Sequence, residues 1–233
     1  MKRLLSTLLA LTMALALVAA SFAGCGNSSS GTSTTAAATT AAAEGTGTVK
    51  IGMSGPLTGG ASAYGLAVKA GMEVAVEEIN AKGGLQIEFN AQDDEADGEK
   101  AVSAYNVLKD WGMQLSLGSV TSKPCEATAA ENYSDRIFAL TPSASSVAVT
   151  EGKDNVFQMC FMDPNQGTAS AQYIAEQKLG TKVAIIWKND DVYSTGIHDK
   201  FVEEAKTKGL EVVSDMTFTD SSANDFSVQL NDA

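Results

Sequence analysis

The fold is set by residues 49–65, which read VKIGMSGPLTGGASAYG. Apolar side chains alternate at Val49, Ile51 and Met53, which is typical of a half-buried strand. A loop over residues 54–64 follows, and its Gly, Ser and Thr content is too high for a hydrophobic core. Apolar residues then recur at helical spacing over residues 66–79, up to a glycine pair at 83–84 that ends a helix. The stretch therefore predicts a strand, a glycine-rich loop and a long helix.

The same unit repeats along the rest of the chain. A helix capped by Asp97 is expected, and Asp163 with Pro164 opens another, with a carboxylate cap and proline in the first turn. Strands that alternate with helices predict βαβ crossovers and a parallel sheet with helices on both faces. We expect a strongly buried strand at residues 182–187. The other expected strands are residues 85–89, 113–117, 137–140, 156–161 and 210–218.

Hydroxyl-rich loops follow three of these strands, at residues 54–64, 118–122 and 141–145. In a parallel sheet, ligands bind beyond the carboxyl ends of the strands, where these loops lie. Ser122 stands where a helix begins, so it is either a simple N-cap worth about 1 kcal/mol or part of an anion site that uses the first helical N–H groups. Ser143 and Ser145 allow the same two interpretations. Three such hydroxyls at one sheet edge favour binding.

Composition limits the classes of function. The chain has 233 residues, is 44% apolar and carries a net charge of −12. An apolar fraction of this size supports a folded core. An acidic chain gains nothing from the release of counterions from phosphates, so nucleic-acid binding is not expected.

Catalytic and metal motifs are missing from the pattern. The glycines after the first strand have neither dinucleotide nor P-loop spacing, and the one histidine leaves no convincing catalytic triad. The acidic residues 93–98 resemble a calcium loop, but the twelfth position is Ala104, so a solvated turn is expected. His198 is expected at the surface. We predict no cofactor and no metal. Cys125 and Cys160 are expected to be buried free thiols, with a disulfide as the alternative in an oxidising compartment.

The first 48 residues have the pattern of an export and tethering segment. Lys2 and Arg3 precede an apolar run over residues 4–20, which is typical of a signal peptide, although an uncleaved membrane anchor is the alternative. Residues 23–25, Ala-Gly-Cys, resemble a bacterial lipobox, although Phe22 departs from its usual leucine. This resemblance implies a signal peptide over residues 1–24 and lipidation of Cys25. Residues 25–48 are rich in Ser, Thr and Ala and are predicted to form a flexible tether.

From residue 49 to its end, the chain carries a set of marker stretches: residues 51–59, Tyr64-Gly65, 77–84, 118–122, 141–145, Asp163, 165–167 and 190–196. On these stretches it resembles the substrate-binding proteins of bacterial ABC importers for branched-chain amino acids, the leucine/isoleucine/valine-binding type. The resemblance implies an α/β fold, a periplasmic-binding-protein-like two-lobed clamp of parallel sheets flanked by helices. It also implies a receptor that captures a small amino acid and delivers it to an ABC permease, outside the cytoplasm and anchored to the membrane by lipid.

The resemblance also assigns roles to single residues. By position, Ser122 holds the ligand α-carboxylate through its hydroxyl and N–H, and Ser143 offers its backbone carbonyl to the α-ammonium group. Ser145 contacts the backbone of the bound amino acid, and Ala144 between them belongs to the same site. Where the family often has alanine, this chain has Ser143, which suggests a smaller or more polar ligand. The remaining expected contacts are Tyr64 at the cleft mouth, Asp163 at the crossover and Tyr193 from the second lobe.

The expected domains are a first lobe over residues 49–162 and a partial second lobe over residues 163–233. The family needs a longer chain to complete both lobes, so the sequence is expected to be a fragment or a truncated reading frame. Three alternatives stay open: a sensory ligand-binding module of the same fold, a truncated product without function, and an exported enzyme. The last is disfavoured because no base–nucleophile pair is present.

Overall fold

The computed structural model describes residues 47–233 of the chain. The predicted signal peptide, the lipidation of Cys25 and nearly all of the predicted tether lie outside the described residues.

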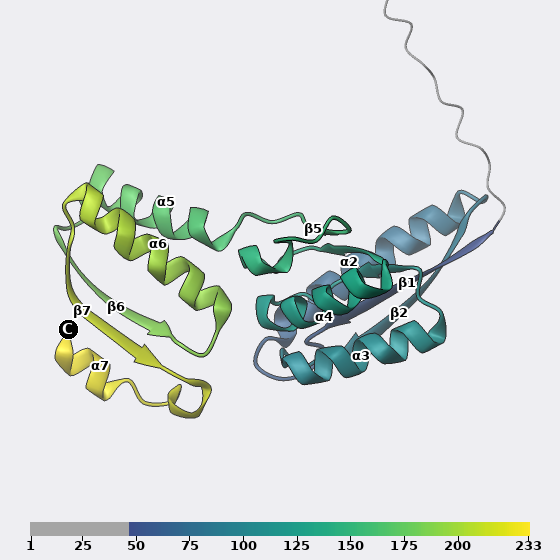
Figure 1. Cartoon of the computed structure of the whole chain (residues 1–233), viewed down its shortest axis with the longest axis horizontal. Helices are drawn as coiled ribbons and strands as arrows, with labels where there is room; N and C mark the ends of the chain where they lie inside the picture. The colour runs from purple at the N-terminus through teal and green to yellow at the C-terminus, as the bar shows by residue number, and fades with distance from the viewer. Residues whose placement is uncertain (1–46) are drawn as a thin grey trace, which may run out of the picture. The chain divides into compact units, whose positions relative to one another are not determined.

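The first part of the described chain is built on five parallel strands in the order β2-β1-β3-β4-β5 (Figure 1). The strands are β1 (Thr48–Gly55), β2 (Gln86–Asp93), β3 (Leu115–Leu117), β4 (Phe138–Thr141) and β5 (Val156–Gln158). Three helices connect them: α2 (Ser62–Ala81), α3 (Gly98–Trp111) and α4 (Ser122–Asp135). A short 3₁₀ turn, η1 (Val147–Val149), precedes β5. The predicted parallel α/β architecture is confirmed.

The second part repeats the unit around a sheet of two parallel strands, β6 (Lys182–Lys188) and β7 (Glu211–Phe218). The helix α5 (Asp163–Glu176) precedes β6, and α6 (Val192–Lys208) connects the two strands (Figure 1). A 3₁₀ turn, η2 (Asp220–Ser222), and the short helix α7 (Ser227–Asp232) follow β7. Glycine keeps α5 and α6 close, because a Cβ at Gly167 would lie 2.2 Å from the carbonyl oxygen of Ile197.

Local signals fix the helix ends where side chains reach backbone groups nearby. The Asp97 carboxylate accepts hydrogen bonds from the N–H groups of Glu99 and Lys100, so it caps α3 as predicted. At the other end, Gly112 takes a φ of 93°, which favours glycine. The predicted strand at 156–161 is shorter than expected and stops at Gln158.

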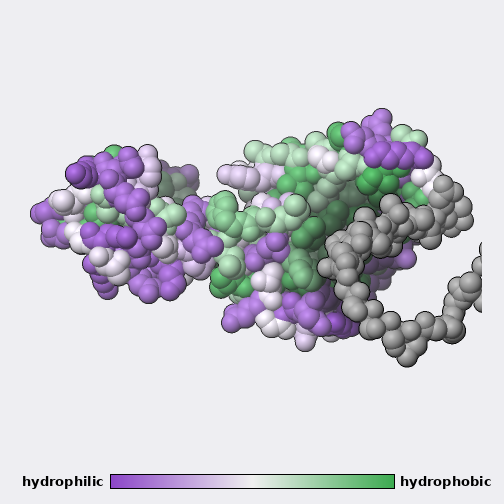
Figure 2. All heavy atoms as spheres, turned by 90° about the horizontal axis from the view of Figure 1, so that it is seen from above, coloured by the Kyte–Doolittle hydropathy of each residue, from purple (hydrophilic) through white to green (hydrophobic). Residues whose placement is uncertain are grey.

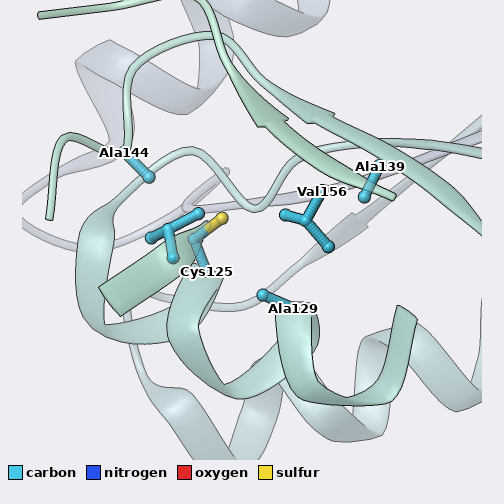
Figure 3. Close-up of a cluster of buried hydrophobic side chains, with 6 residues drawn as sticks. Cys125, Ala129, Ala139, Ala144 and Val156 are labelled. Carbon is cyan, nitrogen blue, oxygen red and sulfur yellow. The ribbon is translucent and has the colours of Figure 1, made fainter. Parts of the chain in front are cut away.

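The largest cluster of buried apolar side chains lies between α4 and one face of the five-stranded sheet. Its side chains are small, which lets the helix approach the strands closely (Figure 3). A second cluster, of Tyr105, Leu108 and Met113, joins α3 to the same region. The members of the first cluster are Cys125, Ala129, Ala139, Ala144, Val149 and Val156.

The opposite face of the five-stranded sheet is covered far less completely. Register and alternation place six apolar side chains on it: Ile51, Leu115, Leu117, Phe138, Leu140 and Phe157. Phe138 and Phe157 stack at 5.3 Å yet stay 42% and 45% exposed. On α2, Gly65 is the one buried residue, and Figure 2 shows apolar residues (green) exposed over this part of the surface.

The second sheet shows the same incomplete cover. Residues of β6 are exposed or half-buried, so the prediction of a strongly buried strand at residues 182–187 was wrong. The hydrophobic sequence is that of a strand buried on both faces, but the described residues supply helices mainly for one. Among residues 47–233, no helix combines the length and hydropathy needed to cross a membrane.

We expect Gly167→Ala to destabilise the chain by about 1–3 kcal/mol, because the added methyl group would push α5 away from the backbone of α6. The measurement is the free energy of unfolding in urea. Gly71→Ala on α2 is the matched control, since a Cβ there meets nothing within 4 Å, and alanine favours a helix by roughly 0.5–1 kcal/mol. Equal losses in both variants would contradict the close α5–α6 contact.

Candidate functional site

The candidate site lies at the carboxyl ends of β1, β3 and β4, where the loop before α4 meets the loop after β4. Ser122 is the first residue of α4 and the N-cap position belongs to Thr121, so the interpretation of Ser122 as a simple N-cap was wrong. The buried hydroxyl oxygen of Ser122 instead accepts hydrogen bonds from the N–H groups of Ser145 at 3.1 Å and Ser146 at 3.2 Å. One side chain therefore joins two loops.

Further hydrogen bonds fasten the loop after β4. The Ser143 hydroxyl donates to the carbonyl oxygen of Val120 at 2.6 Å, and the Thr141 hydroxyl donates to that of Ser119 at 2.7 Å. The carbonyl oxygen of the fully buried Ala144 accepts from the side-chain amide of Gln158 at 2.7 Å. The side chains of the two loops thus hold backbone groups in place.

The loop after β3 approaches β1 at Gly118. This residue has a φ of 145°, and a Cβ there would lie 2.5 Å from the carbonyl oxygen of Ser54. The side chains of Ser54 and Ser119, both buried, then meet at an oxygen–oxygen distance of 2.5 Å. Glycine is required at residue 118 because no side chain fits between the two backbones.

Asp163 links this edge of the sheet to α5. Its N–H donates to the carbonyl oxygen of Ser145 at 3.0 Å, and the residue is 1% exposed. The predicted carboxylate cap was wrong: Met162 is the N-cap, and neither carboxylate oxygen of Asp163 has a hydrogen-bond partner within residues 47–233. Burial raises the pKa of Asp163, the Ser145 hydroxyl opposes this change, and the negative charges of Asp191 and Glu126 add to it.

A groove of about 330 Å³ opens beside Asp163. In its wall, Glu126 accepts a hydrogen bond from the Ser146 hydroxyl at 2.6 Å, which adds a second carboxylate. A Cβ at Gly196 would lie 2.9 Å from that of Asp163, so glycine lets α6 pack against it. The lining comes from α4, η1 and the first turns of α5 and α6: Glu126, Ser146, Val147, Ala148, Asp163, Pro164, Val192, Thr195 and Gly196.

The two predicted aromatic residues are accessible. Tyr64, in the first turn of α2, is 66% exposed, and Tyr193, in the first turn of α6, is 39% exposed. Within residues 47–233, no hydrogen bond or aromatic contact joins either ring to the serine loops. The structure therefore brings together Ser122, Ser143, Ala144, Ser145 and Asp163, and leaves the two tyrosines outside that cluster.

Sequence reasoning missed the role of Asp93. Its carboxylate accepts from the N–H groups of Leu57 at 2.8 Å and Thr58 at 3.3 Å, and also from the Thr58 hydroxyl. Although desolvation opposes the change, these bonds lower the pKa of Asp93. The loop that runs from β1 to α2 is therefore held by the strand beside it, which the position of Asp93 at the end of β2 could have suggested.

Two further expectations about ionisable residues were wrong. The acidic segment 93–98 is not fully solvated, because Asp94 within it is 0% exposed. The side chain of His198 is only 11% exposed: its ring stacks on Trp187 at 4.0 Å and Nε2 lies 3.0 Å from Asp215. Local charge suggested surface positions, but neighbours from other elements cover both residues.

The cysteines and the metal prediction can be compared with the described part of the chain. Cys125 and Cys160 are both free, Cys125 is buried and Cys160 is half-buried. The Cys160 thiol donates to the carbonyl oxygen of Ala144 at 3.3 Å. Burial raises the pKa of Cys125 to about 12, so it stays a thiol. Residues 47–233 contain no group of three His, Cys, Asp or Glu residues that could hold a metal ion.

With this geometry in view, the chain can be placed among known proteins. The family model described as periplasmic binding protein matches residues 48–233. The chain therefore belongs to the periplasmic binding protein family, a family of substrate-binding transport proteins.

Curated relatives and solved structures agree with this assignment. The Leu/Ile/Val-binding protein BraC3 of Rhizobium johnstonii is 34% identical over 175 residues, which are 72% of this chain and 47% of the relative. The leucine-, isoleucine-, valine-, threonine- and alanine-binding protein of Pseudomonas aeruginosa is 30% identical and covers 71% of this chain and 45% of the relative. The chain spans about half the length of the curated relatives it matches.

Among solved structures, the branched-chain amino acid transporter substrate-binding protein LivJ of Streptococcus pneumoniae, in complex with isoleucine, has a TM-score of 0.73 and 32% identity. The match covers 79% of this chain and 53% of that structure. The leucine-binding protein LivK of Thermotoga maritima gives a TM-score of 0.73 at 29% identity, over 78% and 52% of the two chains. The structural likeness supports the fold class predicted from the sequence.

Ser122→Ala should destabilise the folded chain by about 1–3 kcal/mol, because the buried N–H groups of Ser145 and Ser146 lose their acceptor. Urea unfolding measures the loss. The control is Ser103→Ala, an exposed serine on α3 whose hydroxyl donates only to the carbonyl oxygen of Glu99, and whose removal should stay within about 0.5 kcal/mol. If Ser122→Ala unfolds at the same urea concentration as the control, the Ser122 hydroxyl does not contribute measurably to holding the two loops together.

Proposed function

We propose that the chain is the ligand-binding part of an extracytoplasmic receptor that captures a small amino acid and delivers it to the permease of an ABC importer. The binding of branched-chain amino acids by its relatives supports this proposal, and leucine, isoleucine and valine are the default ligands. The signal peptide over residues 1–24 and lipidation of Cys25 are part of the proposal. The lipid would anchor the receptor to the membrane, with residues 25–48 as a tether.

One feature of the geometry supports a zwitterionic ligand above others: a helix start and a buried carboxylate are joined by a single residue. Ser145 bonds to the Ser122 hydroxyl through its N–H and to the N–H of Asp163 through its carbonyl. The beginning of α4 offers N–H groups and the positive end of a helix dipole to a carboxylate. Asp163 offers negative charge, without a partner of its own among the described residues, to an ammonium group.

The remaining predicted contact residues have different roles in this proposal. Ser143 and Ala144 shape the loop, since the Ser143 hydroxyl is already bonded to Val120 and the Ala144 carbonyl to Gln158. Tyr64 and Tyr193 are exposed aromatic rings that can cover the apolar side chain of a ligand. Capture then follows a population shift, in which a ligand that contacts both lobes stabilises the closed arrangement.

Two other functions predict different behaviour. A sensor module of the same fold would bind the same ligands but transmit the signal to a partner other than a permease. A truncated product without function would bind none of them. An enzyme is not proposed, because the family consists of substrate-binding transport proteins.

We expect the full chain to bind leucine, and Asp163→Asn to weaken binding by about 10- to 100-fold, which is the loss of one charge-assisted hydrogen bond. The probes for isothermal calorimetry are leucine, 4-methylpentanoate, which lacks the amino group, and 3-methylbutylamine, which lacks the carboxylate. Wild type should prefer leucine to 4-methylpentanoate, and Asp163→Asn should lose most of that preference.

Asp110→Asn, an exposed carboxylate on α3, is the matched control and should bind like wild type. Asp163→Asn should fold at least as well as wild type near neutral pH. In wild type, the pKa of the Asp163 carboxyl is raised in the folded state, so its charged form opposes folding above the ordinary pKa of aspartate. The neutral amide of the variant does not. A variant that keeps the full preference for leucine would remove Asp163 from the site.

A further inference from the structure

A second buried carboxyl lies under the proposed ligand site, and none of the assigned roles uses it. Asp94 is 0% exposed and stands just beyond β2. Its backbone is fixed on both sides: its N–H donates to Gly55 at 3.0 Å, and its carbonyl accepts from Asp97 at 2.8 Å. Of its carboxyl oxygens, Oδ1 accepts from the N–H of Ala96, while Oδ2 is buried with no hydrogen-bond partner in residues 47–233.

The Asp94 backbone bonds to Gly55, the neighbour of Ser54, and the Ser54 hydroxyl lies 2.5 Å from that of Ser119, in the loop that leads to Ser122. The Ser119 hydroxyl also lies 3.3 Å from the Thr128 hydroxyl, and it opposes the rise in the pKa of Asp94 that burial causes. The Ser119 carbonyl accepts from the Thr141 hydroxyl, whose oxygen accepts from the Ala144 N–H at 3.0 Å. A buried polar network thus runs from Asp94 to both loops of the proposed site.

The number of protons in this network depends on Asp94. A carboxylate can only accept hydrogen bonds, whereas a neutral carboxyl group also donates one. With Asp94 ionised, the single Ser119 proton is drawn toward Asp94. With Asp94 neutral, the carboxyl can donate, and the Ser119 proton is free for Ser54 or Thr128.

The ionised and neutral states of Asp94 also differ in their effect on the charge of a bound ligand. An ionised Asp94 places a buried negative charge beneath the loop that, on the proposed function, receives the ligand carboxylate. Screening by salt is weak for buried charges, so the two negative charges repel each other across the loop. The neutral form of Asp94 removes this repulsion.

We propose that Asp94 is a positioning residue for the carboxylate-binding loop and that ligand binding favours its neutral form, so that amino-acid binding is coupled to proton binding at Asp94. The inference rests on the proposed function. The inference adds a pH dependence to that function: the affinity for the amino acid falls as Asp94 ionises.

The surroundings place this ionisation in a useful range. Burial raises the pKa of Asp94 to about 6, and the negative charges of Asp93 and Asp97 act in the same direction. Asp163 in the proposed site also has a pKa raised by burial, and its ionisation acts in the opposite direction because the charged form attracts the ligand ammonium group. The effect of Asp94 is therefore the difference between wild type and Asp94→Asn. Three other titratable neighbours stay fixed in this range. Hydrogen bonds lower the pKa of Asp93 and of Asp97, so both remain ionised, and the Cys125 thiol on α4 remains protonated.

The test is the dissociation constant of the full chain for leucine at about pH 5 and about pH 7.5, a range in which leucine itself keeps both charges. Between the two pH values, wild type should lose about fivefold more affinity than Asp94→Asn, which is neutral at residue 94 throughout; fivefold is the lower end of ordinary coupling between sites. Calorimetry near pH 6 in two buffers of different ionisation enthalpy should show that wild type takes up more protons on binding than Asp94→Asn.

Asp110→Asn, which removes an exposed carboxylate on α3, is the matched control and should keep the pH dependence of wild type. Equal pH dependence in wild type and Asp94→Asn, or equal proton uptake by the two proteins, would overturn the inference and leave the proposed function standing. A chain that binds leucine at neither pH would overturn the proposed function, and the inference with it.

The stability of the ligand-free chain checks that Asp94→Asn folds and that Asp94 titrates. The pKa of Asp94 is higher in the folded state than in the unfolded state, so neutral Asp94 favours folding. Stability in urea should therefore fall in wild type as pH rises from about 4 to about 6, and should fall less in Asp94→Asn. A wild-type curve with the same slope as the variant would count against the titration of Asp94.

Discussion

The hydroxyl of Ser122 is the interaction on which the candidate site depends. It accepts two backbone N–H groups from a loop 23 and 24 residues further along the chain. Because those N–H groups are buried, they need an acceptor, and no other atom of residues 47–233 supplies one. The same hydroxyl therefore fixes the start of α4, the course of the loop after β4 and, through Ser145, the position of Asp163.

The site is surrounded by carboxylates whose environments differ sharply. Asp93 and Asp94 are adjacent in sequence, but hydrogen bonds lower the pKa of Asp93 and burial raises that of Asp94. Strand alternation and the turn after β2 send one side chain to the loop of residues 57–58 and the other into the protein. In one location, the chain thus has a fixed negative charge that holds a loop and a titratable group that can respond to a ligand.

The incomplete cover of the two sheets does not extend to the part of the structure that supports the site. A parallel sheet normally has helices on both faces, yet Phe138 and Phe157 are nearly half exposed and β6 is only partly buried. The loops of the candidate site lie at the ends of the strands and are held by hydrogen bonds on their own side. The geometry of the serine loops therefore depends on the α4 core, which is buried, and not on the open face.

By itself, the sequence determined the order of strands and helices, the parallel sheet and the edge at which hydroxyl-rich loops gather, because periodicity and caps such as Asp97 act over a few residues. Only the tertiary structure decided which groups those hydroxyls meet, that Asp94 and Asp163 are buried, and that His198 stacks on Trp187. These properties depend on distances between residues far apart in the chain. Spacing in the sequence does not encode such distances, and they are fixed only when the strands pair and the helices pack.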